Sequence, residues 1–246
     1  MLIEADYSQI ELRGLAAFSQ DETLKGIYKD GRDLHSETAR SALNIPLHEA
    51  VPKEDRTFAK GVNFGVIYGE TAWGLARQLN KPVDEAERFI ENFFTMFPQA
   101  REWIERVQAF ARKHGRVYTM FGRWRTLENA RIKPHTEEET RLYEEAMRQA
   151  SNAPIQGTAS DICQVSAIEL EKQFALLPPT IEASLVSTVH DSLLVECRQG
   201  KESVVIRLMR EVMTTAPLVW IADQWGDVPI VVDFKVGTTW GDAVEV

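Results

Sequence analysis

The expected fold of this chain depends first on the segment Ser184-Leu-Val-Ser-Thr-Val-His190-Asp191-Ser-Leu-Leu-Val-Glu-Cys197. Two β-favouring runs flank a short polar tip, and this pattern predicts a β-hairpin with His190 and Asp191 at its turn. A third apolar run, Leu2 to Tyr7, predicts a strand near the N-terminus that carries Asp6 at its end. If the three strands belong to one antiparallel sheet, the Asp6 and Asp191 carboxylates can lie side by side.

Most of the remaining chain has the pattern of helices. We expect helices over 8–18, 55–68, 84–97, 98–115 and 202–214, and a last strand over 230–236. Thr136-Glu-Glu-Glu139 has the form of a capping box and opens another helix. We expect this helix to end before Pro154 and a separate one to run from Thr158 to Leu177, because proline interrupts helices. The predicted class is α+β and rich in helices.

The composition is that of an ordinary globular protein. Hydrophobic residues make up 44% and charged residues 26% of the 246 residues, which excludes a disordered chain. The longest clean apolar stretch, 216–222, is far shorter than the roughly 20 residues of a membrane span. The N-terminus lacks the pattern of a signal peptide, and two cysteines are too few for a disulfide framework. We therefore expect a cytoplasmic protein with no membrane contact.

The formal net charge is −9, which taken alone argues against a polyanionic partner. The charge is unevenly distributed, however. Between Arg101 and His135 the sequence has nine Lys or Arg residues against three acids. This segment permits a strip that faces nucleic acid on an otherwise acidic body. Solvated helix faces explain the same count equally well.

The two strand-end aspartates have a chemical interpretation. Mg²⁺ characteristically binds one or two protein carboxylates together with substrate phosphates, so Asp6 and Asp191 fit a two-metal site for phosphoryl transfer. The alternative is structural. Aspartate favours turns, and a chain with 37 acidic residues places two of them at strand ends by chance.

The predicted helix 55–68 has an unusual face. Four of its residues are spaced four apart: Arg56, Lys60, Phe64 and Tyr68. Each step of four residues turns only about 40° beyond one full helical turn, so all four side chains lie along one face. Two cations can bind the phosphates of a nucleotide, and the two aromatic rings can stack on its base or sugar. The alternative is an amphipathic helix whose rings belong to the core.

Three segments together resemble the family A DNA polymerases, the group of bacterial DNA polymerase I. Motifs A, B and C of this family are similar to Asp6-Tyr-Ser-Gln-Ile-Glu-Leu-Arg13, Arg56-x₃-Lys60-x₃-Phe64-Gly-x₂-Tyr68-Gly69 and Val189-His-Asp191. They occur in the family's order. Further matches are Gly31-Arg-Asp-Leu-His35, Phe121-Gly-Arg123, Asn152-Ala-Pro-Ile-Gln156-Gly-Thr158 and Val236-Gly-x₂-Trp240. The resemblance extends over essentially the whole chain.

The resemblance implies a site for two Mg²⁺ ions, with Mn²⁺ as a substitute. Asp6 and Asp191 would be the metal-binding carboxylates, and the backbone carbonyl of Tyr7 a further ligand. One ion would lower the pKa of the primer 3′-hydroxyl and the other would neutralise the triphosphate. Lys60 would be a catalytic residue that protonates the pyrophosphate leaving group.

The resemblance also assigns the incoming dNTP to one set of residues: Gln9, Glu11, His35, Arg56, Lys60, Phe64 and Tyr68. Within this set, Glu11 would be a steric gate against a ribose 2′-hydroxyl and would be bonded to Tyr68. Phe64 stands where the family has Phe or Tyr, and Phe is associated with discrimination against dideoxynucleotides.

A second set would contact primer-template DNA near the primer terminus: Arg148, Asn152, Gln156 and His190. Minor-groove acceptors are shared by all base pairs, so such contacts can be independent of sequence. Each residue also has a local explanation, because Asn152 fits a helix terminus, Gln156 an exposed loop and His190 a turn.

The implied fold is a right-hand polymerase. Its palm, with an antiparallel sheet, would comprise 1–20 with motif A and 135–246 with the motif C hairpin 184–198. Its helical fingers would comprise 21–134. The thumb and exonuclease domains of the family precede motif A, and these 246 residues do not include them. We expect either a split, phage-type polymerase whose second polypeptide supplies them or a truncated reading frame.

Two residues depart from the family pattern. Ser192 follows His190-Asp191 where a glutamate is usual, which predicts a slower or more Mn²⁺-tolerant enzyme. Gly61 replaces a polar residue after Lys60. Two rival functions stay open. An inactive DNA-binding or assembly subunit is suggested by Ser192 and the missing thumb, and a single-subunit RNA polymerase shares a related palm, an aspartate pair and a motif B Lys and Tyr. Glu11 and the 152–156 motif argue against the RNA polymerase, and the retained Asp6 and Asp191 argue against the inactive subunit.

Overall fold

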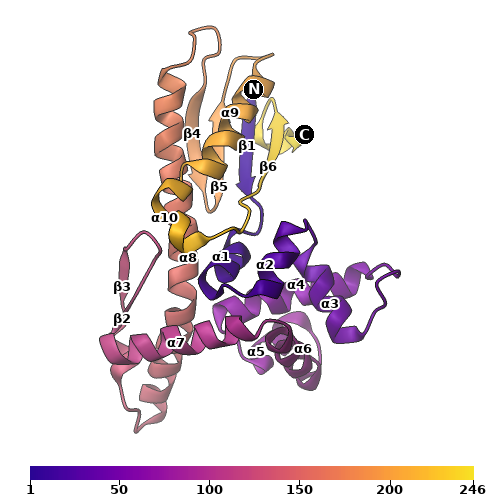
Figure 1. Cartoon of the computed structure of the whole chain (residues 1–246), viewed down its shortest axis with the longest axis vertical. Coiled ribbons are helices and arrows are strands. Elements are labelled where there is room, and N and C mark those ends of the chain that lie inside the picture. The colour runs from indigo at the N-terminus through magenta and orange to yellow at the C-terminus, as the bar shows by residue number, and fades with distance from the viewer. The chain divides into compact units, whose positions relative to one another are not determined.

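In the computed structural model, which describes residues 1–246, the N-terminal strand β1 (Leu2–Tyr7) lies in the middle of a five-stranded sheet (Figure 1). The strand order is β4-β5-β1-β6-β7, and every neighbouring pair is antiparallel. The other strands are β4 (Ser184–Val189), β5 (Ser192–Glu196), β6 (Val232–Gly237) and β7 (Val244–Glu245). The hairpin and the N-terminal strand thus share one antiparallel sheet, as predicted.

The chain forms two compact units. The first contains residues 1–10, 157–225 and 229–246, and the second contains residues 11–156 and 226–228. The units are divided near residues 10 and 156, whereas the predicted palm and fingers are divided near residues 20 and 134. The assignment of palm and fingers stays a prediction.

The first unit packs helices against one face of its sheet. Strand β1 alternates, with Ile3, Ala5 and Tyr7 buried and the residues between them only half-buried. Helices α8 (Glu137–Ala175) and α9 (Glu202–Thr215) cover the buried face, because the Tyr7 hydroxyl contacts residues of both. Helix α10 (Leu218–Trp225) follows α9, and Figure 1 shows α9 lying across the strands.

The second unit is mostly helical. Its helices are α1 (Ile10–Ser19), α2 (Glu22–Lys29), α3 (Leu34–Leu43), α4 (Lys53–Tyr68), α5 (Ala72–Leu79), α6 (Val83–Met96) and α7 (Pro98–His114). Phenylalanine pairs join α4 and α6: the Phe58 and Phe89 rings meet edge to face at 4.6 Å. Helix α7 begins at Pro98 and ends at Gly115 with φ 65°, as predicted.

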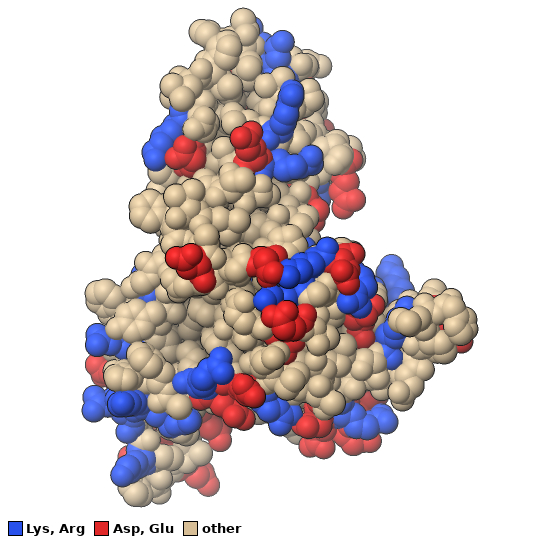
Figure 2. Space-filling model, in the orientation of Figure 1, with Lys and Arg blue, Asp and Glu red and all other residues tan.

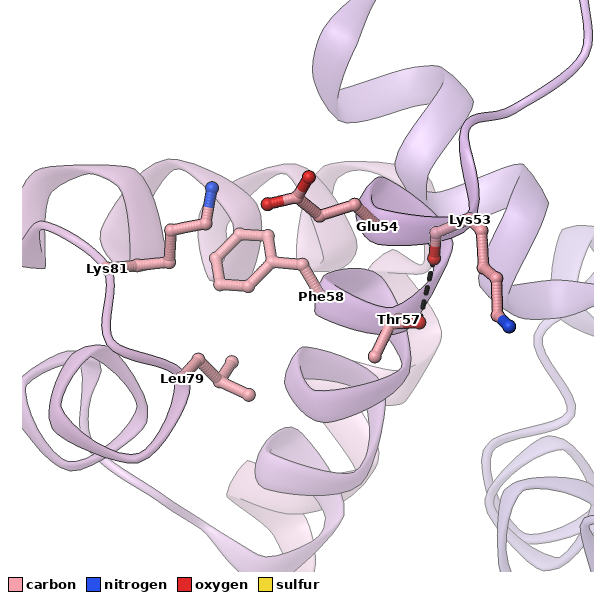
Figure 3. A pocket seen from close by; sticks show the side chains of 6 residues that line it. All are labelled: Lys53, Glu54, Thr57, Phe58, Leu79 and Lys81. Carbon is pink, nitrogen blue, oxygen red and sulfur yellow. Dashed lines mark hydrogen bonds between the residues drawn. The ribbon is translucent and has the colours of Figure 1, made fainter.

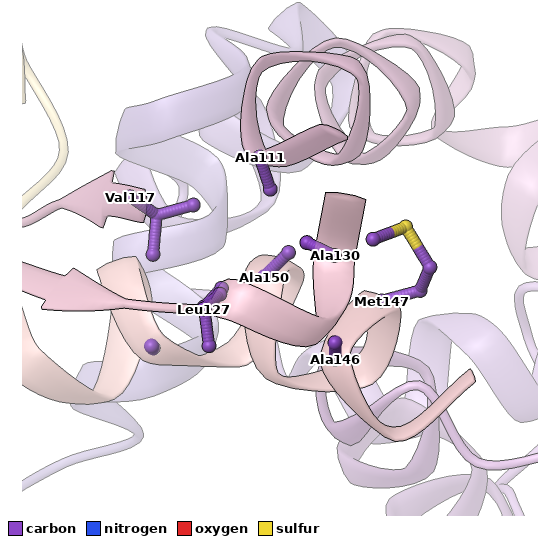
Figure 4. Close-up of a cluster of buried hydrophobic side chains, with 8 residues drawn as sticks. Ala111, Val117, Leu127, Ala130, Ala146, Met147 and Ala150 are labelled. Atoms are coloured by element: carbon purple, nitrogen blue, oxygen red, sulfur yellow. The ribbon is translucent and has the colours of Figure 1, made fainter. Parts of the chain in front are cut away.

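A small hairpin follows α7 in the second unit. It comprises β2 (Arg116–Tyr118) and β3 (Trp124–Thr126), and the short 3₁₀ helix Glu128–Arg131 follows it. Buried side chains from α7, the hairpin and α8 form one apolar cluster beneath it (Figure 4): Ala111, Val117, Leu127, Ala130, Ala146, Met147, Ala150 and Ala153. The hairpin is therefore anchored on a packed core.

One predicted boundary is wrong. Helix α8 is continuous from Glu137 to Ala175 and contains Pro154, where we expected a helix end and a second helix. A proline inside a helix costs about 3 kcal/mol, because it removes one hydrogen bond and clashes with the preceding turn. Ala153 and Ile155, on either side of Pro154, are buried, and this packing offsets the cost. None of the helices has the length and apolar composition to cross a membrane.

Candidate active site

Asp6 and Asp191 meet at one end of the sheet in the first unit. Asp6 is at the end of β1, and its Cα is paired with that of Ser192, the residue after Asp191. The backbone N–H of Tyr7 donates a hydrogen bond to the Asp191 carbonyl at 3.2 Å. His190 forms the turn before Asp191 with φ 55°, in the left-handed region. Register and turn together bring two carboxylates, 185 positions apart, to the same place.

Asp6 lies in a partly buried place where negative charge predominates. Burial, and next the nearby Asp191 carboxylate, raise the pKa of Asp6 from 3.8 to about 6. Glu4 and Asp233 act in the same direction, and Lys235 opposes them. Like charges held close together in a partly buried place favour the binding of a cation.

The donor set at this place fits Mg²⁺. No group of three or more His, Cys, Asp or Glu residues forms a metal cluster of its own. Two carboxylates with a nearby backbone carbonyl are nevertheless the kind of set that Mg²⁺ uses when substrate phosphates supply further oxygens. The Tyr7 side chain holds this backbone in place, because its hydroxyl donates to the Met213 carbonyl at 2.9 Å and accepts from Ser166 Oγ at 2.7 Å.

Ser192 has a local role at the hairpin turn. Its side chain is buried, and Oγ donates a hydrogen bond to the Val189 carbonyl at 2.9 Å. The serine therefore closes the turn between β4 and β5. It adds no third carboxylate beside Asp6 and Asp191.

The predicted nucleotide-binding face of α4 exists in the second unit. Arg56, Lys60 and Tyr68 are exposed and Phe64 is half-buried, whereas Phe58, Ala59, Val62 and Val66 between them are buried. The Phe64 and Tyr68 rings are stacked with centroids 6.3 Å apart. The rings therefore line the exposed face and do not belong to the core.

Arg56 is paired with an aspartate that the sequence analysis did not single out. Arg56 Nε donates to Asp33 Oδ2 at 2.7 Å, and Nη2 donates to Asp33 Oδ1 at 3.0 Å. Asp33 also caps α3, since it accepts a hydrogen bond from the Ser36 N–H at 3.0 Å. Its hydrogen bonds to Arg56 and Ser36 outweigh burial and lower the pKa of Asp33 to about 2. A phosphate at Arg56 would compete with this carboxylate.

His35 is held by Asn63, a second residue that the sequence analysis missed. Asn63 Nδ2 lies 3.0 Å from His35 Nδ1, and both side chains are buried. An amide NH₂ only donates, so Nδ1 accepts and the ring proton of a neutral His35 is on Nε2. Burial, and also the charges of Arg56 and Lys60, lower the pKa of His35 to about 4, although Asp33 opposes them. Asn63 lies directly before Phe64, and this position was the only signal in the sequence.

Glu11 and Tyr68 are bonded, as the resemblance implied. The Tyr68 hydroxyl donates to Glu11 Oε2 at 2.8 Å. The two residues are far apart in sequence, yet both belong to the second unit. Phe64 lies between Tyr68 and His35, whose ring centroid is 5.9 Å from that of Phe64. The steric-gate role of Glu11 stays a prediction.

Gly61 has a packing explanation. A Cβ at this position would lie 2.6 Å from Leu79 Cδ2, closer than van der Waals contact allows. Leu79 also lines a pocket of about 460 Å³ beside the start of α4, together with Phe58 and Lys81 (Figure 3). This pocket contains none of the predicted nucleotide-binding residues. The glycine thus permits α5 to approach α4 closely.

The predicted DNA-contacting residues are placed as follows. Arg148, Asn152 and Gln156 are spaced four apart on α8, so they follow one side of the helix. Asn152 Oδ1 is buried and has no hydrogen-bond partner, while Gln156 and His190 are exposed. Gln9 has φ 53° in the turn after β1. The predicted site residues fall in both compact units. The first unit contains Asp6, Tyr7, Gln9, His190 and Asp191, and the second unit contains the others.

Comparisons with known proteins match the chain over nearly its whole length. Residues 1–242 match the family described as DNA polymerase family A. The chain is 40% identical over 244 residues to "DNA polymerase I, thermostable" of Thermus filiformis, which covers 99% of this chain and 27% of that protein. It is 35% identical over 242 residues to DNA polymerase I of Pseudomonas aeruginosa, and this match covers 98% of this chain and 25% of that protein.

A solved structure shows the same fold. The "POL domain of Pol1 from M. smegmatis complex with DNA primer-template and dNTP" matches with a TM-score of 0.83 and 34% sequence identity. The match covers 98% of this chain and 40% of the other. The chain therefore spans about a quarter of the length of the curated relatives and less than half of this structural neighbour.

Proposed function

Because the chain belongs to the family A DNA polymerases, we propose that it performs template-directed DNA synthesis. The reaction transfers dNMP from a dNTP to the 3′-hydroxyl of a primer and releases pyrophosphate. One observation supports this more than any other. The sheet joins Asp6 and Asp191 at one end, where burial and next the Asp191 carboxylate raise the pKa of Asp6 to about 6, so a cation held there would stabilise both carboxylates.

Asp6 and Asp191, with the Tyr7 carbonyl, would hold the divalent metal ions. When bound, Mg²⁺ would supply charge neutralisation of the triphosphate and a lowered pKa of the primer hydroxyl. The protein's part is to fix these oxygens. Tyr7 does so through its buried hydroxyl, and the N–H of the same residue holds the Asp191 carbonyl.

The cationic end of α4 would bind the triphosphate. Arg56 can present two parallel N–H donors, which it now gives to Asp33, and Lys60 contributes an exposed ammonium one turn further along. His35, whose pKa burial lowers to about 4 and whose Nδ1 lies against Asn63, would donate from Nε2 to a phosphate oxygen. Lys60 would give its proton to the pyrophosphate as that group leaves, which stabilises the developing charge.

The aromatic end of α4 would select the sugar. The hydrogen bond from Tyr68 holds the Glu11 carboxylate, and we propose that this carboxylate takes the space that a ribose 2′-hydroxyl would need. Phe64 presents a ring without a hydroxyl beside Tyr68. The enzyme should therefore prefer dNTPs and incorporate dideoxynucleotides poorly.

Primer-template DNA would contact the side chains of Arg148, Asn152, Gln156 and His190. The buried Asn152 Oδ1 lacks a partner, and a buried polar atom without one carries an energetic cost that a ligand can remove. The structural neighbour named above was solved with DNA primer-template and dNTP, which supports these partners. A second polypeptide that supplies a thumb would add grip on the duplex.

Primer extension by the purified chain tests this proposal. A labelled primer on a short template is incubated with Mg²⁺ and either dNTPs or rNTPs. We expect extension with dNTPs that Asp191→Asn abolishes. Asp223→Asn is the matched control, because it makes the same change at an exposed aspartate on α10.

Three outcomes would contradict parts of the proposal. Extension with rNTPs at the same rate would indicate an RNA polymerase. Extension that survives Asp191→Asn would show that another site or a contaminant is responsible. No extension, even after addition of a polypeptide bearing a thumb, would favour the assembly subunit that the serine at position 192 suggests.

A further inference from the structure

The hairpin of β2 and β3 presents an aromatic face to solvent. Tyr118 on β2 is paired directly with Trp124 on β3, and Arg116 is paired with Thr126. Directly opposed residues point to the same side of a hairpin, as do residues two apart on one strand. All four side chains therefore share one face, and each of them is exposed. Trp124 is 62% exposed.

This exposure belongs to a firmly held element. Val117, between Arg116 and Tyr118, points to the opposite side and is fully buried in the cluster with Ala111 and Leu127 (Figure 4). The Leu127 N–H also bonds the Gly115 carbonyl at 2.7 Å, which closes the base of the hairpin. The fold thus anchors one face and leaves the aromatic face open.

Helix α7 extends the aromatic face. The Phe110 ring, 39% exposed, lies edge to face against Tyr118 with centroids 6.1 Å apart. The same ring contacts His114 at 4.2 Å. The guanidinium of Arg116 lies 5.7 Å from the Tyr118 ring centroid. Large aromatic groups in such a row would be expected in a core, and here they face water.

The segment of the chain that carries this face is rich in basic residues. From Phe110 to Lys133 the chain has seven Lys or Arg residues and one acid, in a protein whose net charge is −9. The ion pairs of α7 involve Arg101 and Arg106, and none involves Arg116 or Arg125. Figure 2 shows Lys and Arg gathered at the lower left, where Figure 1 draws the end of α7. Cations without carboxylate partners are available to phosphates.

We propose that this face binds single-stranded nucleic acid, with unpaired bases stacked on Trp124 and Tyr118 and a phosphate held by Arg116. Base stacking on aromatic side chains combined with a positive groove is how proteins bind single strands without regard to sequence. A duplex offers only its phosphates, because its bases are already stacked. The identification of this strand as unpaired template rests on the proposed function, but the binding itself does not.

Fluorescence anisotropy tests the proposal with the full chain. A labelled thymidine 20-mer and a blunt 20-base-pair duplex are titrated separately, with EDTA and without nucleotides. We expect Trp124→Ala to weaken binding of the single strand by about tenfold, since each stacked base contributes substantially, and to leave duplex binding unchanged. Trp124→Phe should retain most of the affinity.

Trp220→Ala is the matched control, because this tryptophan on α10 is also largely exposed and lies outside the basic segment. Single-strand binding that Trp124→Ala leaves unchanged would overturn the proposal. An equal loss for single strand and duplex would overturn it too, because the face would then be a general phosphate contact. Since EDTA removes the metals, the assay gives the same answer for a catalytically dead chain, so its failure is distinct from failure of the proposed function.

Discussion

At the scale of single residues, Asp6 and Ser192 show how charge and turn geometry are arranged at the candidate site. Asp6 is partly buried beside the Asp191 carboxylate, and burial and this like charge both disfavour its ionised form. The Ser192 hydroxyl donates its hydrogen bond to the Val189 carbonyl, and this bond stabilises the turn that contains Asp191. The geometry of the site is thus fixed by groups that do no chemistry.

Asp6→Asn should stabilise the metal-free chain at pH 7.5. The folded-state pKa of Asp6 is raised to about 6 from 3.8, so the folded protein binds more protons between these values and its stability rises as pH falls from 6 to 4. Above pH 6 the Asp6 carboxylate is charged, so the cost of its burial and of its repulsion by Asp191 is fully present, and the neutral amide lowers that cost. We expect a rise of about 2 °C in the melting temperature in EDTA, and less at pH 4.5. A lower melting temperature at pH 7.5 would contradict this.

Ser192→Glu should raise the rate of Mg²⁺-dependent synthesis. A third carboxylate beside Asp6 and Asp191 would support the metal site, and such supporting groups change metal affinity or activity by about tenfold or more. Steady-state extension rates with Mg²⁺ and with Mn²⁺ measure the effect, and the advantage of Mn²⁺ should shrink. Ser192→Ala is the control, because it loses the Val189 hydrogen bond without adding a charge. An unchanged or lower Mg²⁺ rate for the glutamate variant would count against the idea.

Phe64→Tyr should relieve discrimination against dideoxynucleotides. The Phe64 ring is stacked beside Tyr68 on the open face of α4, so a hydroxyl there could replace the hydrogen bond of the missing 3′-OH. One such hydrogen bond can raise the relative rate of ddNTP incorporation by up to about tenfold. The ratio of ddNTP to dNTP incorporation, measured in one assay for both proteins, should rise by that factor. Equal ratios would refute the role assigned to Phe64.

At the scale of elements, local signals and packing contributed differently. Pro98 and Gly115 predicted the two ends of α7 correctly, because helix capping depends on residues within one turn. The expectation that proline ends a helix was wrong for Pro154. Burial of Ala153 and Ile155 on either side of it outweighs the energetic cost of a proline inside α8. Helix α10 and the hairpin of β2 and β3 are short, and their patterns were too weak to predict.

Gly61→Ala should destabilise the contact between α4 and α5. The new Cβ would lie 2.6 Å from Leu79, and overpacking of this kind costs about 1–3 kcal/mol. Gly26→Ala on α2 is the matched control, because no atom lies within 4 Å of the added Cβ and alanine favours helices. Urea unfolding should show a lower free energy of unfolding for Gly61→Ala. Adding Leu79→Ala removes the clash, so in the Leu79→Ala background the Gly61→Ala change should cost less. Equal stability of the Gly61 and Gly26 variants would show that α5 shifts freely.

At the scale of the whole molecule, the distribution of charge matters more than its sum. A net charge of −9 would repel DNA, yet the segment 110–133 concentrates cations. This contrast suggests that DNA approaches by a limited part of the surface. The predicted site residues also belong to both units, with Asp6 and Asp191 in the first and Arg56 and Lys60 in the second.

Affinity for primer-template DNA should fall steeply with salt despite the acidic charge. Each phosphate contact releases counterions, so the logarithm of the binding constant falls with the logarithm of salt concentration. Arg116→Ala should reduce the magnitude of this slope by about 1, as loss of one phosphate contact does. Arg207→Ala, which removes a charge from α9, is the control. Anisotropy between 50 and 200 mM salt, about fourfold apart, resolves the slopes. A salt-independent affinity would exclude phosphate contacts as its basis.

The sequence by itself determined the class of fold, the spacing of the three motifs and the open face of α4. These features depend on neighbours within a few turns or on the order of residues along the chain, and both can be read directly. The same basis singled out six predicted site residues, namely Asp6, Arg56, Lys60, Phe64, Tyr68 and Asp191, whereas the others were named through the resemblance. The bond between Glu11 and Tyr68 was anticipated only through the resemblance.

The tertiary structure alone decided the rest. It paired Asp6 with Ser192 across the sheet, placed Asn63 on His35 and Asp33 on Arg56, and carried α8 through Pro154. Each of these depends on contacts between residues distant in sequence, whose energies exceed local preferences only once the chain is packed. The exposed face of Trp124 belongs here too, because exposure is defined by what the remainder of the fold leaves uncovered.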